Sequence, residues 1–220
     1  MILGLTGGYC SGKNAVAAML SVRGWLCIDV DALGHRALEE TAEAVVKLLG
    51  PGVVADPSLG APAASVGIDS PRTEGQAAMS RFRLDRKKIG AAVFADPALL
   101  KRYEAIVHPA MLRLLDEAID VAGPQPAARV CINAAILYRL PQLARCDAVA
   151  EIRASVVTRL IRGRLRDGLS AGLVLDRIRR QKPLWKAGAS YRGERIIIRN
   201  DGGLAALERR VDRLNRALTG

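Results

Sequence analysis

The residues best suited to chemistry stand at the start of the chain, in the run MILGLTGGYCSGKN. Gly7, four further residues and then Gly12-Lys13 have the spacing of a phosphate-binding loop. In such a loop, backbone N–H groups converge on phosphate oxygens, and the helix that follows adds the positive end of its dipole. The lysine brings a point charge to the β- and γ-phosphates. The sequence therefore predicts a nucleoside triphosphate site, made of Gly8, Tyr9, Cys10, Ser11, Gly12, Lys13 and Asn14.

The last position of this loop departs from the usual pattern. A Ser or Thr hydroxyl there normally binds Mg²⁺, whereas this chain has Asn14. The amide offers a carbonyl oxygen at a different reach, so Asn14 is a candidate Mg²⁺ ligand in place of a hydroxyl. The alternative is a tight strand–helix turn that binds nothing. The apolar run before the loop and the helix-like run after it favour the phosphate site.

Two carboxylates, Asp29 and Asp31, close the second predicted strand. The carboxyl ends of parallel strands border the ligand crevice of an open α/β sheet, so both should lie near the transferred phosphoryl group. A carboxylate there takes a proton from an attacking hydroxyl or helps to hold Mg²⁺. We expect Asp31 to be catalytic and to contact the acceptor substrate, and Asp29 to be a metal ligand. The alternative for Asp31 is a helix N-cap.

A dense basic run follows residue 152 and contains five arginines. Arg159, Arg162 and Arg166 are spaced by three and four residues, so they share one face of a predicted helix. The planar guanidinium binds phosphate through two parallel hydrogen bonds, and such a face could close over the triphosphate as a lid. We take Arg162 and Arg166 as the nucleotide-binding candidates. The alternative is a solvated helix surface.

Both histidines of the chain are candidates for substrate binding. His35 lies one helical turn after Asp31, where it could line the same cleft. His108 stands before Pro109 and after the apolar pair Ile106-Val107. A structural hydrogen bond is the competing interpretation for His108.

Strand-like and helix-like segments alternate along the chain, which is typical of βαβ units and a parallel sheet covered on both faces. The segment 51–80 is rich in Gly, Pro, Ala and Ser and is predicted to be a loop. A break is expected at His108-Pro109, because proline disfavours helix in the residue before it. Strands are predicted at 2–6, 25–29, 129–133, 148–152 and 195–198. Helices are predicted at 13–22, 32–49 in one or two pieces, 84–94, 97–121, 155–166 and 171–181, with another after residue 203.

Composition limits the class of protein. The chain has 220 residues, of which 50% are hydrophobic, enough for one large core or for a core with an inserted subdomain. We find no signal peptide or bilayer-spanning run, so we expect a cytoplasmic protein with four reduced thiols. The formal net charge of +11 suggests a polyanionic partner, either nucleic acid or a phosphate-rich substrate. Aromatic residues make up only 4%, which argues against stacking of nucleic acid bases.

These segments together resemble the dephospho-coenzyme A (dephospho-CoA) kinase family. LTGGYCSGKN is similar to that family's LTGGIGSGKS loop, and the resemblance covers most of the chain apart from roughly residues 55–80. The other similar segments are IDVDALGHRAL, RKKIGAAVFADPALLKRYEAIVHPAML, RDGLS with RIRRQ, and IIIRNDGGLAALERRVDRL. The second of these, from the central helical region, is the most discriminating match.

The resemblance implies an α/β fold: a three-layer parallel sheet of the P-loop nucleotide-kinase type, with a helical substrate-binding insertion and an Arg-rich lid. We predict the core at 1–50, 126–154 and 193–220, the helical region at about 51–125 and the lid at about 155–192. It implies transfer of the γ-phosphoryl group of ATP, with Mg²⁺, to the ribose 3′-hydroxyl of dephospho-CoA. Lys13 then matches the loop lysine and Asp31 the residue that accepts the hydroxyl proton.

The chain departs from this family in three places. Asn14 replaces a serine, Ala135 and Arg139 fall where Pro and Glu are expected, and the spacing from Gln181 to Asn200 is slightly expanded. Two alternatives therefore stay open. One is a kinase of another nucleotide-like metabolite, and the other is a non-catalytic nucleotide or RNA binder related to such kinases.

Overall fold

The computed structural model describes residues 1–55, 83–122, 128–188 and 190–219. The loop predicted over 51–80 therefore lies almost entirely outside the described residues. The chain divides into two compact units. The first contains Met1–Asp31 and Leu115–Gly220, and the second contains Ala32–Leu114.

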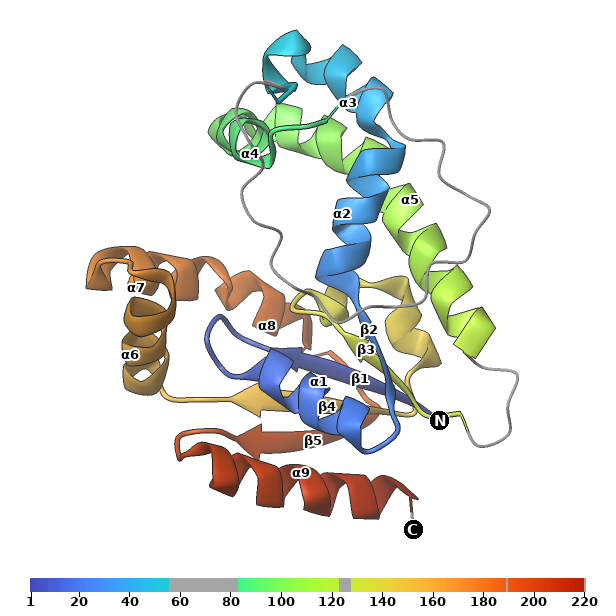
Figure 1. Cartoon of the computed structure of the whole chain (residues 1–220), viewed down its shortest axis with the longest axis vertical. Coiled ribbons are helices and arrows are strands. Elements are labelled where there is room, and N and C mark those ends of the chain that lie inside the picture. The colour runs from blue at the N-terminus through green and yellow to red at the C-terminus, as the bar shows by residue number, and fades with distance from the viewer. Residues whose placement is uncertain (56–82, 123–127, 189, 220) are drawn as a thin grey trace. The chain divides into compact units, whose positions relative to one another are not determined.

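A five-stranded, all-parallel sheet forms the centre of the first unit (Figure 1). The strand order is β2-β3-β1-β4-β5, so β1 lies in the middle and the chain turns to opposite sides of it. The carboxyl end of β1 is thus a topological switch point, where ligands bind in open parallel sheets. This sheet confirms the predicted α/β class. The strands are β1 (Ile2–Gly7), β2 (Leu26–Asp29), β3 (Val130–Asn133), β4 (Ala148–Arg153) and β5 (Glu194–Arg199).

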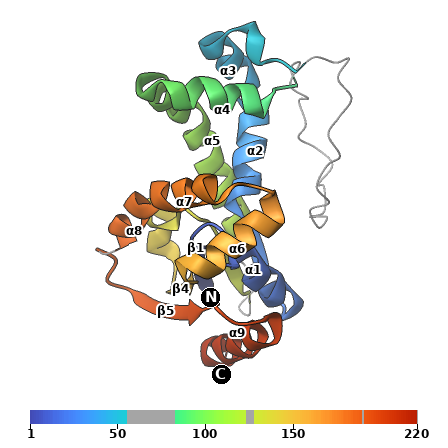
Figure 2. The same ribbon diagram turned by 90° about the vertical axis from the view of Figure 1, so that its left-hand side faces the viewer.

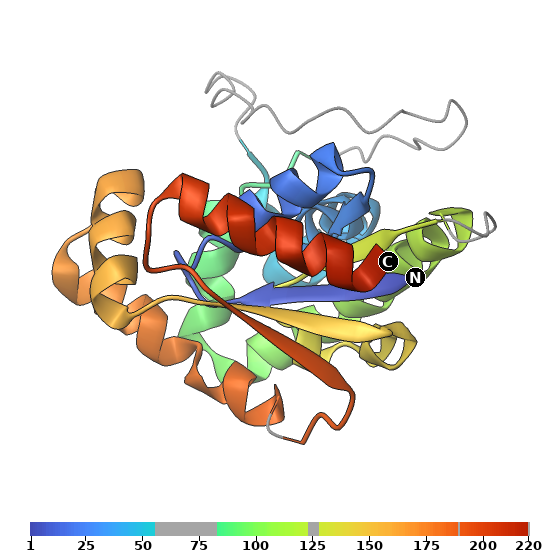
Figure 3. The same ribbon diagram turned by 90° about the horizontal axis from the view of Figure 1, so that it is seen from below.

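Two helices cover one face of the sheet, α1 (Lys13–Val22) and α9 (Leu204–Thr219). Figure 3 shows them side by side over the strands. Successive residues of a strand point to opposite faces, so Leu3 and Leu5 point to this side together. Both are fully buried among apolar side chains of the two helices, including Val16, Leu20 and Val211.

The residues between them in β1 point to the other face of the sheet, which is covered by the segment that follows β3. Gly4 faces Leu137 of a short 3-10 helix, η2 (Leu137–Arg139), and Leu137 is fully buried. A second 3-10 helix, η3 (Pro141–Arg145), follows it. Gln142 of η3 donates to Asp116 of α5 at 3.0 Å. The helix α8 (Lys182–Gly188) packs against η2, so this face is also layered.

Helices α6 (Val156–Asp167) and α7 (Ala171–Arg180) pack side by side after β4 (Figure 2). Each begins with a serine whose hydroxyl accepts a backbone N–H, Ser155 from Thr158 and Ser170 from Leu173. Such caps satisfy donors that have no partner in the first turn of a helix. The predicted bounds of both helices agree with the structure to within one residue. The helix α8 was not predicted, since its seven residues include a proline and a glycine.

The second unit contains helices α2 (Val30–Glu40) from Ala32 on, α3 (Ala42–Leu49), the 3-10 helix η1 (Pro51–Val53), α4 (Arg86–Ala95) and the first part of α5 (Pro97–Ala122). The break predicted at Pro109 is wrong, because α5 continues through it. Pro109 is exposed, while Val107, Met111 and Leu114 are buried on the packed side of the helix. Apolar burial on both sides of the proline compensates for the backbone hydrogen bond that it removes.

No helix within the described residues is long and apolar enough to cross a lipid bilayer.

The packing at Gly4 gives a stability prediction. A Cβ atom there would lie 2.7 Å from Leu137 Cδ2 and 3.1 Å from Cys146 Sγ. Because Leu137 is fully buried, we expect Gly4→Ala to lower the free energy of unfolding by about 1–3 kcal/mol. Urea unfolding curves of the purified variants measure this change.

Gly172→Ala is the matched control. Apart from the helix's own backbone and the chain neighbours, no atom of the described residues lies within 4 Å of a Cβ at Gly172, which is part of α7. Alanine in a helix is favoured over glycine by about 1 kcal/mol, so this variant should be equal to the wild type or slightly more stable. A Gly4→Ala protein as stable as the control would contradict the packing described here.

Candidate functional site

The loop between β1 and α1 has the closed geometry of a phosphate-binding loop. Ser11 N–H donates to Gly8 O at 2.9 Å, and Gly12 precedes the helix with φ of 95°, a left-handed conformation that suits glycine. Cys10 also has a positive φ, 57°. The family loop quoted above has glycine at this place, so the cysteine holds a backbone conformation that costs a non-glycine residue about 1–2 kcal/mol.

Asn200 holds the loop from the other side. It follows β5, is buried, and donates from Nδ2 to Ser11 O at 2.8 Å. Its Nδ2 atom would lie 2.2 Å from a Cβ at Gly12, so the approach requires glycine there. The sequence analysis missed this residue. The available signal was a polar residue placed directly after a strand and before the Asp-Gly-Gly turn.

Lys13 is the first residue of α1 and is only 8% exposed. Its Nζ donates to Asn133 Oδ1 at the carboxyl end of the neighbouring strand β3. Burial lowers the pKa of Lys13, while the charges of Asp31 and then Asp29 raise it. A buried ammonium group whose described hydrogen-bond acceptor is a neutral amide is poorly compensated, and a phosphate group would supply the missing negative charge.

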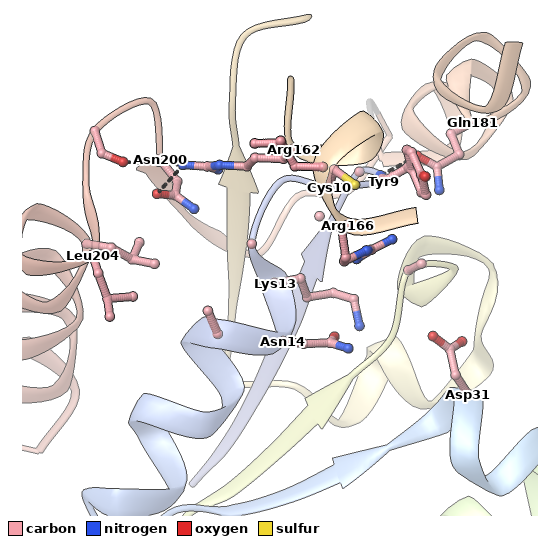
Figure 4. A pocket seen from close by; sticks show the side chains of 18 residues that line it. Tyr9, Cys10, Lys13, Asn14, Asp31, Arg162, Arg166, Gln181, Asn200 and Leu204 are labelled. Atoms are coloured by element: carbon pink, nitrogen blue, oxygen red, sulfur yellow. Dashed lines mark hydrogen bonds between the residues drawn. The ribbon is translucent and has the colours of Figure 1, made fainter. Parts of the chain in front are cut away.

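The two carboxylates lie two residues apart, Asp29 at the end of β2 and Asp31 in the first turn of α2. Asp29 directly precedes α2, and its Oδ1 accepts a hydrogen bond from the backbone N–H of Asp31 at 3.0 Å, within the first turn of that helix. The cap-like contact considered for Asp31 is therefore made by Asp29. The Asp31 side chain is exposed and lies in the same space as the Lys13 ammonium group (Figure 4).

Asn14 forms an amide pair with Asn133. Asn133 Nδ2 donates to Asn14 Oδ1 at 3.4 Å, while Asn133 Oδ1 accepts from Lys13. Both positions are among those that supply Mg²⁺ ligands in P-loop enzymes, the residue after the loop lysine and the end of a neighbouring strand. No group of three or more His, Cys, Asp or Glu side chains at metal-binding distance occurs among the described residues.

A cavity of about 780 Å³ joins these groups (Figure 4). It lies within the size range of small-molecule and cofactor sites, about 300–1,000 Å³. Of the predicted loop residues and carboxylates, Ser11 and Asp29 are not part of its lining. The predicted residues that line it are Gly8, Tyr9, Cys10, Gly12, Lys13, Asn14, Asp31, Arg162 and Arg166.

The arginines of α6 approach this cavity with different partners. Arg162 Nη2 donates to Gly202 O at 3.3 Å and to Asn200 Oδ1 at 3.4 Å. Its Nη1 is buried and has no hydrogen-bond partner among the described residues. A buried guanidinium donor without an acceptor is costly unless a ligand supplies one. Arg162 is thus placed to receive an anion.

Arg166 belongs to a cluster around Tyr9 of the loop. Its guanidinium lies 5.3 Å from the centre of the Tyr9 ring, and that of Arg177 lies 5.4 Å away. The Tyr9 hydroxyl donates to Asp167, and its N–H donates to Gln181 Oε1 at 2.6 Å. The cluster links the loop to both α6 and α7. Sequence reasoning did not identify Asp167, Arg177 or Gln181 as partners of Tyr9, because their contacts with it arise only in the tertiary structure.

The two histidines are both exposed, His35 on α2 and His108 on α5, and both belong to the second unit. Their predicted role in substrate binding stays a prediction. The proposed domain ranges also stay predictions.

Comparison with known proteins decides the family. Residues 75–206, more than half of the chain, match the family model described as Dephospho-CoA kinase. The chain belongs to the dephospho-CoA kinase family. A relative of this name from Anaeromyxobacter dehalogenans is 33% identical over 219 residues, covering 100% of this chain and 92% of the relative. Another from Geobacter sulfurreducens is 33% identical over 216 residues, covering 97% and 96%.

Solved structures have the same fold. A crystal structure from Thermus thermophilus superposes with a TM-score of 0.74 at 31% identity, covering 100% of this chain and 98% of that one. A dephospho-CoA kinase from Campylobacter jejuni superposes with a TM-score of 0.66 at 17% identity, covering 99% and 96%. The family assigned from sequence motifs is therefore confirmed, and the P-loop kinase fold with it.

The Tyr9 cluster gives a prediction about protonation. Arg166, with Nε 2.7 Å from Asp167 Oδ1, and then Tyr9 lower the pKa of Asp167 from its ordinary 3.8 to about 2. Because the folded state binds this proton more weakly than the unfolded chain, the contribution of Asp167 to stability is complete above about pH 4 and is lost as the pH falls toward 2. Carboxyl-carbon NMR titration should give a pKa of about 2 in the wild type.

Arg166→Gln removes the largest cause of this shift. The pKa of Asp167 should then move back toward the ordinary aspartate value of about 3.9. Arg164→Gln, which changes an exposed arginine of the same helix, should leave it unchanged. Equal pKa values in the Arg166 variant and the wild type would contradict the role given to Arg166.

Proposed function

We propose that this protein transfers the γ-phosphoryl group of ATP to the ribose 3′-hydroxyl of dephospho-CoA, yielding CoA and ADP. The observation that carries the proposal is one cavity lined by a phosphate-binding loop, its buried lysine and a free carboxylate, in a chain whose full-length relatives are named dephospho-CoA kinase. ATP and dephospho-CoA are then its substrates. We also propose that the protein is cytoplasmic.

Phosphoryl transfer of this kind depends on positioning and electrostatics, because the transition state is loose and its charge lies on the phosphoryl oxygens. The loop N–H groups and Lys13 would hold the phosphates. Arg162 offers its unpartnered Nη1 to the same cavity. Arg166, held against the Tyr9 ring, would add a second guanidinium on the lid side.

Asp31 is the group we assign to the acceptor. Its carboxylate is exposed, lines the cavity and accepts no hydrogen bond in the described structure, so it is available to a substrate hydroxyl. It would orient the 3′-hydroxyl and take its proton as the phosphoryl group is transferred. His35 and His108 are proposed as further contacts for dephospho-CoA.

The donor set of the site fits Mg²⁺. Mg²⁺ prefers oxygen ligands, keeps several waters and is held by one or two carboxylates together with substrate phosphates. The Asn14 carbonyl oxygen, which lines the cavity, and Asp29, which ends β2 and is not part of the lining, would hold it, with no hydroxyl contributed by the loop. When bound, Mg²⁺ neutralises charge on the β- and γ-phosphates. Asn14 and Asn133 are both uncharged, so the protein should bind the metal mainly through ATP.

This same amide pair favours a second candidate function. A relative that binds nucleotide without transferring phosphate would also tolerate neutral residues at both positions. That candidate predicts equal ATP affinity with and without Mg²⁺ and no product formation. The kinase proposal predicts instead that Mg²⁺ changes the affinity for ATP and that product forms.

The deciding experiment measures ADP release from ATP and Mg²⁺ with and without dephospho-CoA. We expect release only with dephospho-CoA, and formation of an equal amount of CoA. Removing a group that stabilises the transferred phosphate or moves the proton commonly costs 10²–10⁴-fold in rate, so Lys13→Ala and Asp31→Asn should each lose about that much.

Arg209→Ala, on the exposed side of α9, is the control and should retain the wild-type rate. Circular dichroism checks that each variant is folded. Near-normal turnover by the Lys13 or Asp31 variant would reject the assigned roles. Binding of ATP by the wild type without any product would instead support the non-catalytic candidate.

Restoring the usual hydroxyl tests the metal assignment. Asn14→Ser should lower the Mg²⁺ concentration needed for half-maximal activity by roughly tenfold, the lower end of the effect of changing a group beside a metal. Calorimetric titration of ATP at fixed Mg²⁺ concentrations gives the same comparison without turnover. Asn14→Ala should not lower the requirement. If Asn14→Ser behaves as Asn14→Ala does, position 14 does not contact the metal.

A further inference from the structure

A second cavity, of about 540 Å³, lies against the other side of the phosphate-binding loop. Among the residues that the structure describes, Gly8 alone lines both cavities. The residues of the second cavity that could bind a ligand are Ser11, Glu151, Arg153, Arg159, Trp185 and Arg195. None of their side chains is used in the mechanism proposed above, and Ser11 enters it only as part of the loop backbone.

Strand alternation explains why these side chains meet. Ala150 and Ile152 of β4 point into the core beneath α1 and α9, so Glu151 between them points to the opposite face. On β5, Ile198 belongs to that same core and Ile196 packs against it, so Arg195 points to the opposite face as well. These side chains of the second cavity therefore lie on the face of the sheet opposite to α1 and α9.

Glu151 organises two of the arginines. Its side chain is 2% exposed, and its carboxylate accepts from the Tyr138 hydroxyl and from Arg153 Nε at 2.8 Å, with Arg195 Nη1 at 3.5 Å. One carboxylate faces two guanidinium groups, which leaves one positive charge uncompensated. Arg153 and Arg195 keep 51% and 38% of their side chains exposed, so donor groups remain open to a ligand.

Arg159 adds a second uncompensated charge. Its described hydrogen bonds go to neutral oxygens, Tyr9 O at 2.7 Å and Gln181 Oε1 at 3.3 Å. Its guanidinium lies against Gly8, where a Cβ would be 2.6 Å from Nη2. The loop backbone thus separates Arg159 from the ATP cavity and leaves it at the wall of the second cavity.

The Ser11 hydroxyl supplies an independent indication of a ligand. Ser11 is 1% exposed, and its Oγ is buried without a hydrogen-bond partner among the described residues. Such a group is costly to bury unless something accepts its proton. The residue Ser11 lines the second cavity and not the first.

We propose that this second cavity binds a nucleoside monophosphate, at a site distinct from the ATP cavity. The phosphate would lie among Arg153, Arg159 and Arg195, whose planar groups suit phosphate oxygens, with the Ser11 hydroxyl as a further donor. The indole of Trp185, on the cavity wall, offers a surface for the planar base. The volume is within the range of small-ligand sites, about 300–1,000 Å³.

Tryptophan fluorescence tests the proposal without measuring catalysis. The chain has two tryptophans, and Trp25 is 3% exposed with its indole N–H bonded to Asn215 at 2.8 Å, so it gives a constant background. AMP is titrated into the protein already saturated with a non-hydrolysable ATP analogue, which occupies the first cavity. We expect a saturable change in emission that disappears in Trp185→Phe.

Charge variants identify the site. Arg195→Gln and Arg153→Gln should each weaken AMP binding by at least fivefold, measured by equilibrium dialysis, while Arg209→Gln on α9 should have no effect. Two separate arginine variants, with circular dichroism of each, keep the test valid if one fails to fold. Inorganic phosphate should bind at least tenfold more weakly than AMP.

Three results would overturn the proposal. The first is no AMP binding in the presence of the ATP analogue, which would assign any AMP binding to the first cavity. The second is unchanged affinity in both folded arginine variants. The third is equal affinity for inorganic phosphate and AMP, which would exclude recognition of a nucleoside. None of these results bears on ADP release with dephospho-CoA, so the proposed kinase activity stands or falls separately.

Discussion

A buried lysine at a switch point of the sheet is the constraint on which the rest of this structure depends. Lys13 begins α1, and its ammonium group meets the amide of Asn133 in a position with little access to water. Charge is costly to bury without a counter-charge, so the site is completed by an anionic ligand. The central place of β1, with β3 on one side and β4 on the other, brings the loop next to the ends of both neighbouring strands. The loop, the Asp31 carboxylate and two α6 arginines, Arg162 and Arg166, all share one cavity for that reason.

The loop is held by contacts that cross long distances in sequence. Asn200 bonds to Ser11 O, Arg159 bonds to Tyr9 O, and Gln181 accepts the Tyr9 N–H. These contacts come from three separate segments of the chain, one of them α6. They explain how Cys10 keeps a left-handed backbone conformation that favours glycine. The loop of this protein is therefore supported by its surroundings as much as by its own glycines.

Electrostatic balance differs between the two sides of the loop. On the first side, Asp29 and Asp31 oppose Lys13, while Arg162 keeps an unpartnered nitrogen. On the second side, one buried carboxylate, Glu151, orders Arg153 and Arg195 next to Arg159. The high positive charge of the chain is thus partly concentrated at two cavities and not only spread over a solvated surface. A phosphate-rich substrate accounts for one of them.

Local sequence pattern was sufficient for the strands, most helices, the phosphate-binding loop and the family, since glycine spacing, strand periodicity and serine caps act over a few residues. It failed at Pro109, where burial on both sides of the proline outweighed the local preference for a break. It also missed Asn133, Asn200 and Asp167, because their importance lies in partners more than 100 residues away. Only the folded sheet and the helices packed on it decide which distant polar groups meet. Sequence spacing therefore identified which residues could bind phosphate, and tertiary structure determined which of them face the same cavity.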